Sequence, residues 1–326
     1  MRFIIYGAGG IGGVIGAQLA LNGRDVVLIA RGNHLQAIQE WGLTYQTPHR
    51  SEVLDILAIG HPGEIDFRVD DVVLLTMKSQ HTRAALDDLY GAAGDEIPVI
   101  CCQNGVANER AALRRFRRVY AMLVYLPANA LEPGVVQTHA LETIGVLDAG
   151  VYPQGTDDLI AEVTGALTAA RFSAVPNPTV LRFKYAKLLM NLGNAISAVS
   201  PPGEAATEIR RQLQAEGRAC LDAAGIDLAS REEVRERRGE LIRMGEIDGQ
   251  GRQFGSSWQS LTRGTGDIEA DYLNGEIVLL GRLHGVPTPA NAVLQRLANT
   301  LAREHAPAQS IPLAELQRRI SAEASG

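Results

Sequence analysis

Three glycines at fixed spacing follow the first apolar run of this chain. Residues 3–6 read Phe-Ile-Ile-Tyr, and Gly7, Gly9 and Gly12 come directly after them as G-x-G-x-x-G. Between a strand and a helix, Gly7 allows a tight turn, Gly9 allows close approach of a pyrophosphate, and Gly12 allows close helix packing. The start of the helix then offers free N–H groups to phosphate. We therefore expect a bound dinucleotide, contacted by the residues of this turn: Gly7, Gly9, Gly10, Ile11 and Gly12.

The end of the second predicted strand indicates which dinucleotide binds. Residues 25–29 form that strand, and Ala30-Arg31 follow it. In NAD-binding folds an acidic residue near this point binds the ribose 2′-hydroxyl, whereas an arginine suits a 2′-phosphate. A guanidinium can form two parallel hydrogen bonds to that phosphate. The sequence thus predicts NADP(H), with Arg31 at the 2′-phosphate; the alternative is that Arg31 is simply a solvated arginine.

Composition excludes several classes of function. The 326 residues include 31 basic and 37 acidic side chains, a net charge of −6, so we expect no nucleic-acid partner. Cys101, Cys102 and Cys220 have neither metal-ligand nor disulfide spacing, which predicts no metal site and favours a reducing cytoplasm. No apolar stretch approaches the roughly 20 residues of a membrane span. The first strand starts at residue 2 or 3, so we expect no signal peptide and no membrane association.

Strands and helices alternate through the first half of the chain. Apolar runs predict strands at residues 25–29, 71–76, 98–102, 119–124 and 135–146, with a β excursion at 43–60. Helical stretches separate the strands, and this alternation favours an α/β fold with a parallel, doubly wound sheet. We expect an N-terminal Rossmann-type domain at residues 1–175.

Helical patterns dominate beyond the breaker Pro176-Asn177-Pro178. The predicted helices cover residues 179–199, 204–224, 231–244, 266–283 and 290–305. We expect an all-α second domain at residues 176–326. The glycine-rich stretch 245–257 predicts a loop, which is either a mobile lid or a plain linker.

Polar residues follow two of the predicted strands. Lys78 comes after strand 71–76, and Asn104 comes after strand 98–102. Ligands of open α/β sheets bind at the carboxyl ends of the strands, so both residues are expected near the nicotinamide. The alternatives are a surface lysine and an asparagine that serves only its turn.

Four polar residues share a helical spacing in the second half. Lys184, Lys187, Asn191 and Asn194 follow each other in steps of three, four and three, which places them on one face of a single helix. Leucines surround them, so this face should meet a polar partner or ligand, unless it is merely solvated.

The predicted helix 266–283 carries one acidic residue of interest. Its expected buried stripe consists of Ile268, Tyr272, Gly275, Leu279 and Leu283. Glu269 flanks that stripe, where a carboxylate could orient a lysine or take part in proton transfer. It could equally be an acid favoured by the helix dipole.

These motifs, in this order, resemble the ketopantoate reductase (2-dehydropantoate 2-reductase) family. The matching positions are residues 7–12, Arg31, Lys78, residues 103–105, Lys187-Leu188 with Asn191, Ser256-Ser257, residues 269–275 and residues 285–289. The resemblance implies a Rossmann domain, an all-α domain, and hydride transfer from NADPH to the ketone carbon of a 2-oxo acid. The expected reaction is reduction of ketopantoate to pantoate in pantothenate biosynthesis.

The resemblance also implies roles for single residues. Lys187 would be the general acid, and Glu269 would hold it in place and help balance its charge. Asn104 would lie near the nicotinamide and the substrate carbonyl. Lys78 would lie at the edge of the cofactor, while Asn191 and Ser257 would bind the substrate.

Two positions depart from the family pattern. A second substrate asparagine is expected four residues after Asn191, but position 195 is alanine and Asn194 comes one residue early. On a helix that shift rotates the amide by ~100°. The stretch Trp258-Gln259-Ser260-Leu261 lacks the acid usual there. Two alternatives therefore stay open: a reductase for another small 2-oxo acid and a non-catalytic NADP-binding sensor. As partners we expect the small-molecule 2-oxo acid and a possible second copy of the chain, in a homodimer.

Overall fold

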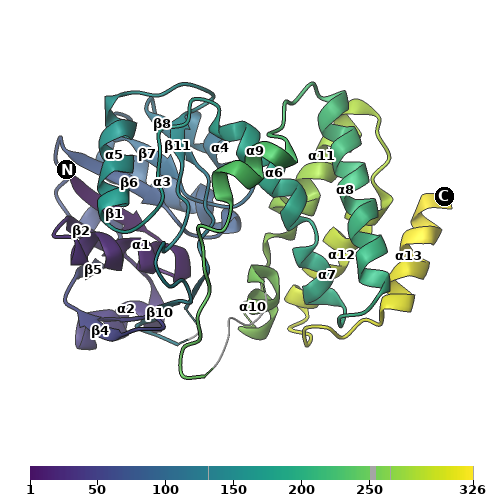
Figure 1. Cartoon of the computed structure of the whole chain (residues 1–326), viewed down its shortest axis with the longest axis horizontal. Helices are drawn as coiled ribbons and strands as arrows, with labels where there is room; N and C mark the ends of the chain where they lie inside the picture. The colour runs from purple at the N-terminus through teal and green to yellow at the C-terminus, as the bar shows by residue number, and fades with distance from the viewer. Residues whose placement is uncertain (131, 250–254, 265, 326) are drawn as a thin grey trace. The chain divides into compact units, whose positions relative to one another are not determined.

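A computed structural model describes residues 1–130, 132–249, 255–264 and 266–325 (Figure 1). Contacts divide the chain into two compact units. The first comprises Met1–Asn104, Asn108–Phe183 and Arg231–Arg252, and the second comprises Gly105–Ala107, Lys184–Ser230 and Gln253–Gly326. The predicted division at residues 175 and 176 concerns independently folding domains and stays a prediction.

A seven-stranded sheet forms the centre of the first unit. Its order is β11 (Ala149–Val151), β8 (Val119–Met122), β7 (Val99–Cys101), β6 (Asp71–Leu75), β1 (Arg2–Tyr6), β2 (Asp25–Ile29) and β5 (Leu57–Ile59). Neighbouring strands are parallel except β11, which runs antiparallel to β8. The chain builds the sheet outward from β1 in both directions, which is the predicted doubly wound α/β fold.

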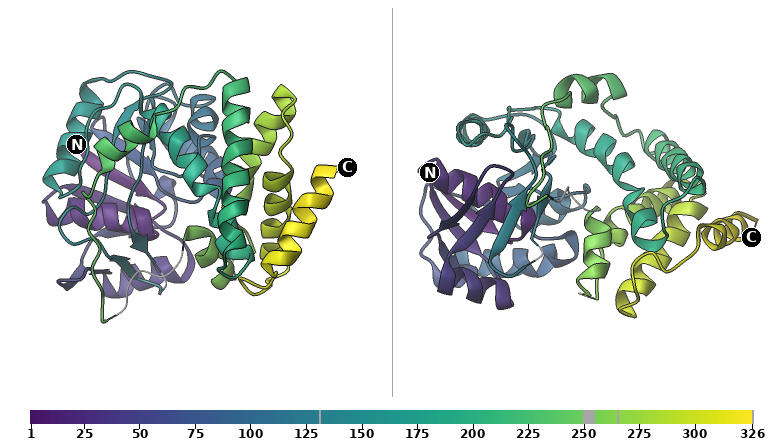
Figure 2. Two further views of the ribbon diagram at one scale, coloured as in Figure 1. Left: turned by 45° about the vertical axis from the view of Figure 1, so that its right-hand side comes forward. Right: turned by 60° about the horizontal axis from the view of Figure 1, so that its bottom comes forward.

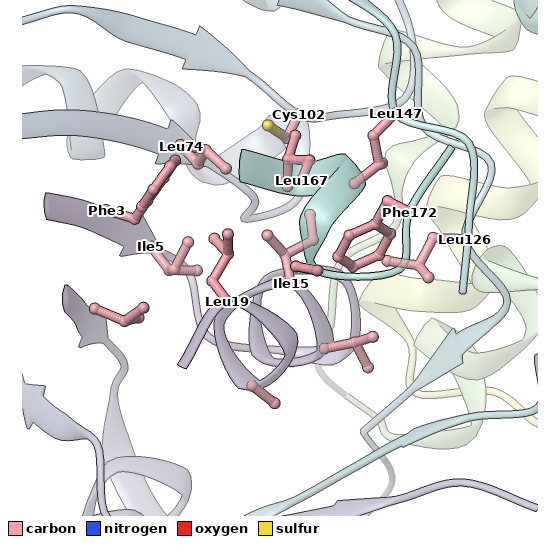
Figure 3. Close-up of a cluster of buried hydrophobic side chains, with 14 of the residues drawn as sticks. Phe3, Ile5, Ile15, Leu19, Leu74, Cys102, Leu126, Leu147, Leu167 and Phe172 are labelled. Atoms are coloured by element: carbon pink, nitrogen blue, oxygen red, sulfur yellow. The ribbon is translucent and has the colours of Figure 1, made fainter. Parts of the chain in front are cut away.

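Helices cover both faces of this sheet, which explains why its strands are continuous apolar runs. The helices are α1 (Gly10–Leu21), α2 (Gly32–Trp41), α3 (Thr82–Ala93), α4 (Asn108–Leu113) and α5 (Asp158–Ala169). On one face, Phe3 and Ile5 belong to the same buried cluster as Ile15 of α1 and Leu167 of α5 (Figure 3). On the other face, Ile4 belongs to a cluster with residues of α3.

A second, four-stranded sheet belongs to the same unit. Its order is β4 (Ser51–Leu54), β3 (Leu43–Gln46), β10 (Val135–Thr138) and β9 (Ala128–Asn129). The β excursion predicted at residues 43–60 is confirmed. The strand predicted at 135–146 is too long, because the chain after Thr138 makes only isolated bridges, such as Ala140 with Met244.

The ordered elements described in the second unit are helices. They are most of α6 (Val180–Asn191), then α7 (Asn194–Val199), α8 (Ala205–Ala223), α10 (Ser256–Thr262), the 3₁₀ helix η3 (Glu269–Tyr272), α11 (Asn274–His284), α12 (Pro289–Arg303) and α13 (Leu313–Ser325). Both views of Figure 2 place α13, in yellow, at the side of this bundle, where it packs on α12 and α8.

Three predicted helices are wrong in extent. The helix predicted at 179–199 is two helices, since Leu192 and Gly193 separate α6 from α7. The helix predicted at 231–244 ends early, as α9 (Arg231–Arg238), and Gly239 follows with φ +43°. The helix predicted at 266–283 is replaced by η3 and α11, and its expected buried stripe fails because Leu279 and Leu283 are 48% and 66% exposed.

Among the described residues, the helices are all too short or too polar to cross a membrane.

Candidate functional site

The glycine-rich turn lies where the strand order of the sheet reverses, after β1. β1 is hydrogen-bonded to both β2 and β6, so its carboxyl end marks the point from which the two halves of the sheet diverge. Ligands of doubly wound folds bind at this point. Gly7 leaves β1 with φ +105°, and a Cβ there would lie 2.6 Å from the backbone nitrogen of Met77. The turn therefore needs glycine at position 7 to fold.

Gly12 and Gly9 have different surroundings. A Cβ at Gly12 would lie 2.4 Å from the carbonyl oxygen of Gly7, so α1 could not approach the turn. Around Gly9, by contrast, a Cβ would meet no described atom within 4 Å. The described first turn of α1 contains no acidic residue, so the positive end of its dipole is not neutralised locally. Open space beside free N–H groups fits a pyrophosphate.

A histidine fixes this turn from outside. His34 of α2 donates from Nε2 to the carbonyl oxygen of Ala8 at 2.7 Å, and its Nδ1 accepts from the backbone N–H of Gly134 at 2.9 Å. The Gly134 bond assigns the proton to Nε2. His34 thereby connects the glycine turn to the segment that leads into β10. Sequence reasoning missed it, because nothing local marks a helical histidine as a partner of a distant turn.

Arg31 is exposed at the end of β2, as the N-cap residue of α2. Its positive charge acts on Tyr6, the last residue of β1. Burial and the Asp88 carboxylate raise the pKa of Tyr6 to about 12, and Arg31 opposes that rise. The arginine is thus near the edge where the cofactor ribose is expected.

Lys78 and Asn104 lie on neighbouring loops of the first unit. β6 and β7 are parallel partners, and these residues follow them by three positions each. Gln103 connects the loops, since its Nε2 donates to the carbonyl oxygen of Met77 at 2.9 Å and to Oγ1 of Thr82 at 2.7 Å. Both predicted residues are half-buried.

In the second unit, α6 carries Lys184, Lys187 and Asn191. Lys184 is buried, and Lys187 and Asn191 are half-buried. The prediction that Asn194 shares their helical face is wrong, because Asn194 starts α7 after the break at Gly193.

The break places Asn194 next to another predicted residue. A Cβ at Gly255 would lie 3.6 Å from Oδ1 of Asn194, and Gly255 is the N-cap of the helix that contains the buried Ser257. Asn194 and Ser257 therefore lie on adjoining elements.

Glu269 is buried in η3, at 6% exposure. Gly105, the residue after Asn104, packs on the same element: it has φ +77°, and a Cβ there would lie 2.8 Å from the carbonyl oxygen of Tyr272. The structure thus requires a glycine directly after Asn104.

The loop predicted at residues 245–257 is only partly described, since residues 250–254 lie outside the described residues. Gly245 donates to the carbonyl oxygen of His139 at 2.7 Å, whereas Ser256 and Ser257 begin α10 instead of continuing a loop. Within the described ranges, no group of His, Cys, Asp and Glu side chains is arranged to hold a metal. The three cysteines are buried thiols that form no disulfide with one another.

Comparison with known proteins gives the same relationship along both halves of the chain. Residues 3–150 match the family described as "Ketopantoate reductase PanE/ApbA", and residues 180–302 match "Ketopantoate reductase PanE/ApbA C terminal". The 2-dehydropantoate 2-reductase of Pyrococcus horikoshii is 28% identical over 304 residues, which cover 91% of this chain and 96% of that protein.

Solved structures share the whole fold. A PanE/ApbA family ketopantoate reductase from Ralstonia eutropha JMP134 is 30% identical, with a TM-score of 0.78 and coverage of 94% of this chain and 99% of that one. A D-mandelate dehydrogenase with NADH and anilino(oxo)acetate has a TM-score of 0.80 at 21% identity, covering 94% and 99%, which shows the fold alone. The sequence matches over both halves, together with a glycine turn built for a dinucleotide, show that this chain belongs to the ketopantoate reductase family of oxidoreductases.

Proposed function

We propose that this chain reduces ketopantoate to pantoate with NADPH, as a step of pantothenate biosynthesis. The observation that carries the proposal is the turn after β1, in which Gly7 and Gly12 are needed for packing while Gly9 faces open space. The space at Gly9 is not needed for packing, so it supports a bound ligand. The family and its curated relatives named 2-dehydropantoate 2-reductase supply the substrate.

The first unit would hold the cofactor. Gly7 and Gly9 donate their backbone N–H groups within the fold, to Ile29 and Gly7, so they shape the turn, and Gly9 leaves space for the pyrophosphate. Gly10, Ile11 and Gly12, in the first turn of α1, would offer their backbone N–H groups to it. The exposed guanidinium of Arg31 suits the 2′-phosphate, and Lys78 and Asn104 lie at the carboxyl edge of β6 and β7, where the nicotinamide is expected. When bound, NADPH supplies the hydride.

Lys187 would supply the proton. A cationic lysine beside the ketone oxygen polarises it and protonates the alkoxide as negative charge develops. Glu269, buried in η3 of the same unit, needs a cation or hydrogen-bond donors to be stable as a carboxylate, and we assign it to holding Lys187. Lys184 is the competing candidate for the acid, since it precedes Lys187 by one helical turn.

The remaining polar groups would bind the substrate. Asn191 ends α6, and the break after it brings Asn194 beside the helix that contains Ser257. These side chains of the second unit offer amide and hydroxyl groups to the substrate's carboxylate and hydroxyl. The resemblance to the family assigns Asn104 of the first unit to the substrate as well. The displacement of Asn194 favours a second candidate: reduction of a different small 2-oxo acid on the same catalytic groups. A non-catalytic NADP-binding sensor would not need Lys187 and Glu269.

A reducing cytoplasmic location and a homodimer are also part of the proposal. The three buried, reduced thiols support the cytoplasmic location. Sedimentation of the purified protein tests the homodimer.

Oxidation of NADPH by a panel of 2-oxo acids tests the function directly. Turnover of ketopantoate at micromolar concentration supports the proposal. If NADPH binds tightly and another 2-oxo acid is turned over instead, the second candidate holds. Binding with no turnover on any member of the panel would leave only the sensor.

A further inference from the structure

A continuous series of buried hydrogen bonds joins the loops that follow β6 and β7. It runs through four polar side chains: Gln103, Thr82, Asn108 and Ser79, each at most 5% exposed. Gln103 donates from Nε2 to Oγ1 of Thr82 at 2.7 Å, and Thr82 donates to Oδ1 of Asn108 at 2.8 Å. Asn108 then donates from Nδ2 to Oγ of Ser79 at 3.0 Å.

The direction of these bonds is consistent from end to end. Because the Gln103 amide can only donate through Nε2, Thr82 must accept there and give its own proton onward. At both of its ends, the series of hydrogen bonds reaches backbone atoms of the two loops. At one end, Gln103 also donates to the carbonyl oxygen of Met77. At the other end, Oγ of Ser79 and Nδ2 of Asn108 each lie 3.5 Å from the carbonyl oxygen of Asn104. Met77 precedes Lys78, so the chain of bonds ends beside both residues assigned to the nicotinamide.

We infer that Gln103, Thr82, Asn108 and Ser79 are positioning residues that set the nicotinamide side of the cofactor site by fixing the Lys78 and Asn104 loops to each other. The inference rests on the proposed function for the roles of Lys78 and Asn104. Buried polar groups are costly unless satisfied, and linked hydrogen bonds reinforce one another. A core that needed only stability could fill this space with apolar side chains.

The chain of bonds lies on one half of the cofactor site only. In doubly wound folds the two mononucleotide halves of a dinucleotide bind on opposite sides of the switch point. β2, which leads to Arg31, is on one side of β1, and β6 and β7 are on the other. Loss of the bonds should therefore weaken contacts to the nicotinamide half and spare those to the adenosine 2′-phosphate half.

A matched pair of substitutions at Thr82, in the middle of the hydrogen-bond series, tests this selective effect. Thr82→Val keeps the shape but removes the hydroxyl, whereas Thr82→Ser keeps the hydroxyl and removes a methyl group. The probes are NADPH and adenosine 2′,5′-bisphosphate, which lacks the nicotinamide, titrated into the full-length protein. We expect Thr82→Val to weaken NADPH by about tenfold and the bisphosphate by less than about twofold, the scale of one unsatisfied buried group. Thr82→Ser should bind both ligands as the wild type does.

Equal loss of both ligands, or of neither, overturns the inference, since a general loss of stability does not select one half of the cofactor. If Thr82→Val fails to fold, Ser79→Ala removes the last side chain of the series and should show the same selective loss, about threefold for NADPH. The readout needs no turnover. A wild-type protein that does not reduce ketopantoate would refute the proposed function while leaving the ligand comparison valid.

Discussion

At the scale of single residues, the glycines of the turn after β1 differ in what they serve: some are needed for packing, and another leaves space for a ligand. Gly7 and Gly9 stand two positions apart in one motif, yet their surroundings differ completely. The motif assigned the tight turn to Gly7 and the approach of the pyrophosphate to Gly9, and their surroundings agree with that division. The motif could not identify the neighbour against which Gly7 packs, because Met77 is distant in sequence.

Gly9→Ala should leave the free energy of unfolding unchanged and weaken NADP(H) binding by at least about tenfold, since its backbone is extended and its new methyl group enters the space for phosphate. Gly7→Ala is the control, and it should lower the free energy of unfolding by about 1–3 kcal/mol through its positive φ and its contact with Met77. Thermal unfolding and cofactor titration measure the two effects. A destabilised Gly9→Ala would contradict the assignment.

Arg31→Ala should weaken NADPH by about 1.5–3 kcal/mol, the scale of hydrogen bonds to a charged group. Binding of NADH should not change, because NADH lacks the 2′-phosphate. Isothermal titration with both cofactors makes the comparison. Equal losses would remove Arg31 from the 2′-phosphate site.

Lys187→Ala should reduce turnover of the 2-oxo acid by at least about a hundredfold, the contribution of a positioned general acid. NADPH affinity should stay close to that of the wild type, since the lysine acts on the carbonyl. Lys184→Ala is the matched variant one turn earlier on α6. If the loss of turnover follows Lys184 instead, the acid has been assigned to the wrong lysine.

At the scale of helices and strands, periodicity located the elements of the first unit better than those of the second. The strands of the parallel sheet are continuous apolar runs, which a sequence shows directly. The break between α6 and α7 is different. A Cβ at Gly193 would lie 2.7 Å from Nε of Arg210, so the side chain of another helix lies against the break. A pattern along one helix cannot reveal such a neighbour.

Helix α9 shows an element held by charge, because all of its residues are at least partly exposed. Arg237 forms two hydrogen bonds to the fully buried carboxylate of Asp148, and Arg182 pairs with Glu233 of α9 nearer the surface. The guanidinium of Arg238 lies 5.0 Å from the centre of the Tyr125 ring.

Arg237→Met should therefore lower the free energy of unfolding by about 3–5 kcal/mol, because it leaves the charge of Asp148 buried without its partner. Arg182→Met, which breaks the more exposed pair, should cost about 1 kcal/mol or less. Denaturant unfolding compares the two. Similar losses from both variants would show that the burial of Asp148 does not decide how much each ion pair of α9 stabilises the protein.

At the scale of the whole molecule, the sequence predicted the fold class but not the path of residues 231–249. Their helical pattern assigned them to the second half, whereas the described residues of this stretch pack with the first unit. The contacts responsible join residues about 100 positions apart. The backbone N–H of Leu141 donates to the carbonyl oxygen of Arg243, and the N–H of Gly245 donates to the carbonyl oxygen of His139. No pattern in the sequence indicates either pairing. Such pairings depend on where the completed sheet places its edges.

Two tyrosines of the first unit make the free energy of unfolding depend on pH in the alkaline range. Tyr6 and Tyr120 each lie in the first unit with their hydroxyls against a carboxylate, and burial, assisted by Asp88 and Asp157 respectively, raises each pKa to about 12. An unfolded tyrosine titrates near 10. A group whose pKa is raised on folding contributes stability that is full below the unfolded pKa and is lost as the pH rises through the folded pKa.

The free energy of unfolding should thus fall steadily between pH 10 and about 12, before the two folded phenols ionise. Ultraviolet titration of the native protein should show these two of the eight tyrosines in a late phase, which they share with Tyr45 and Tyr125, because burial raises the pKa of those phenols as well. The variant Tyr6→Phe with Tyr120→Phe should reduce that late phase and flatten the decline in stability. A decline of the same slope in the double variant would mean that other groups, and not these phenols, limit the stability of the sheet at high pH.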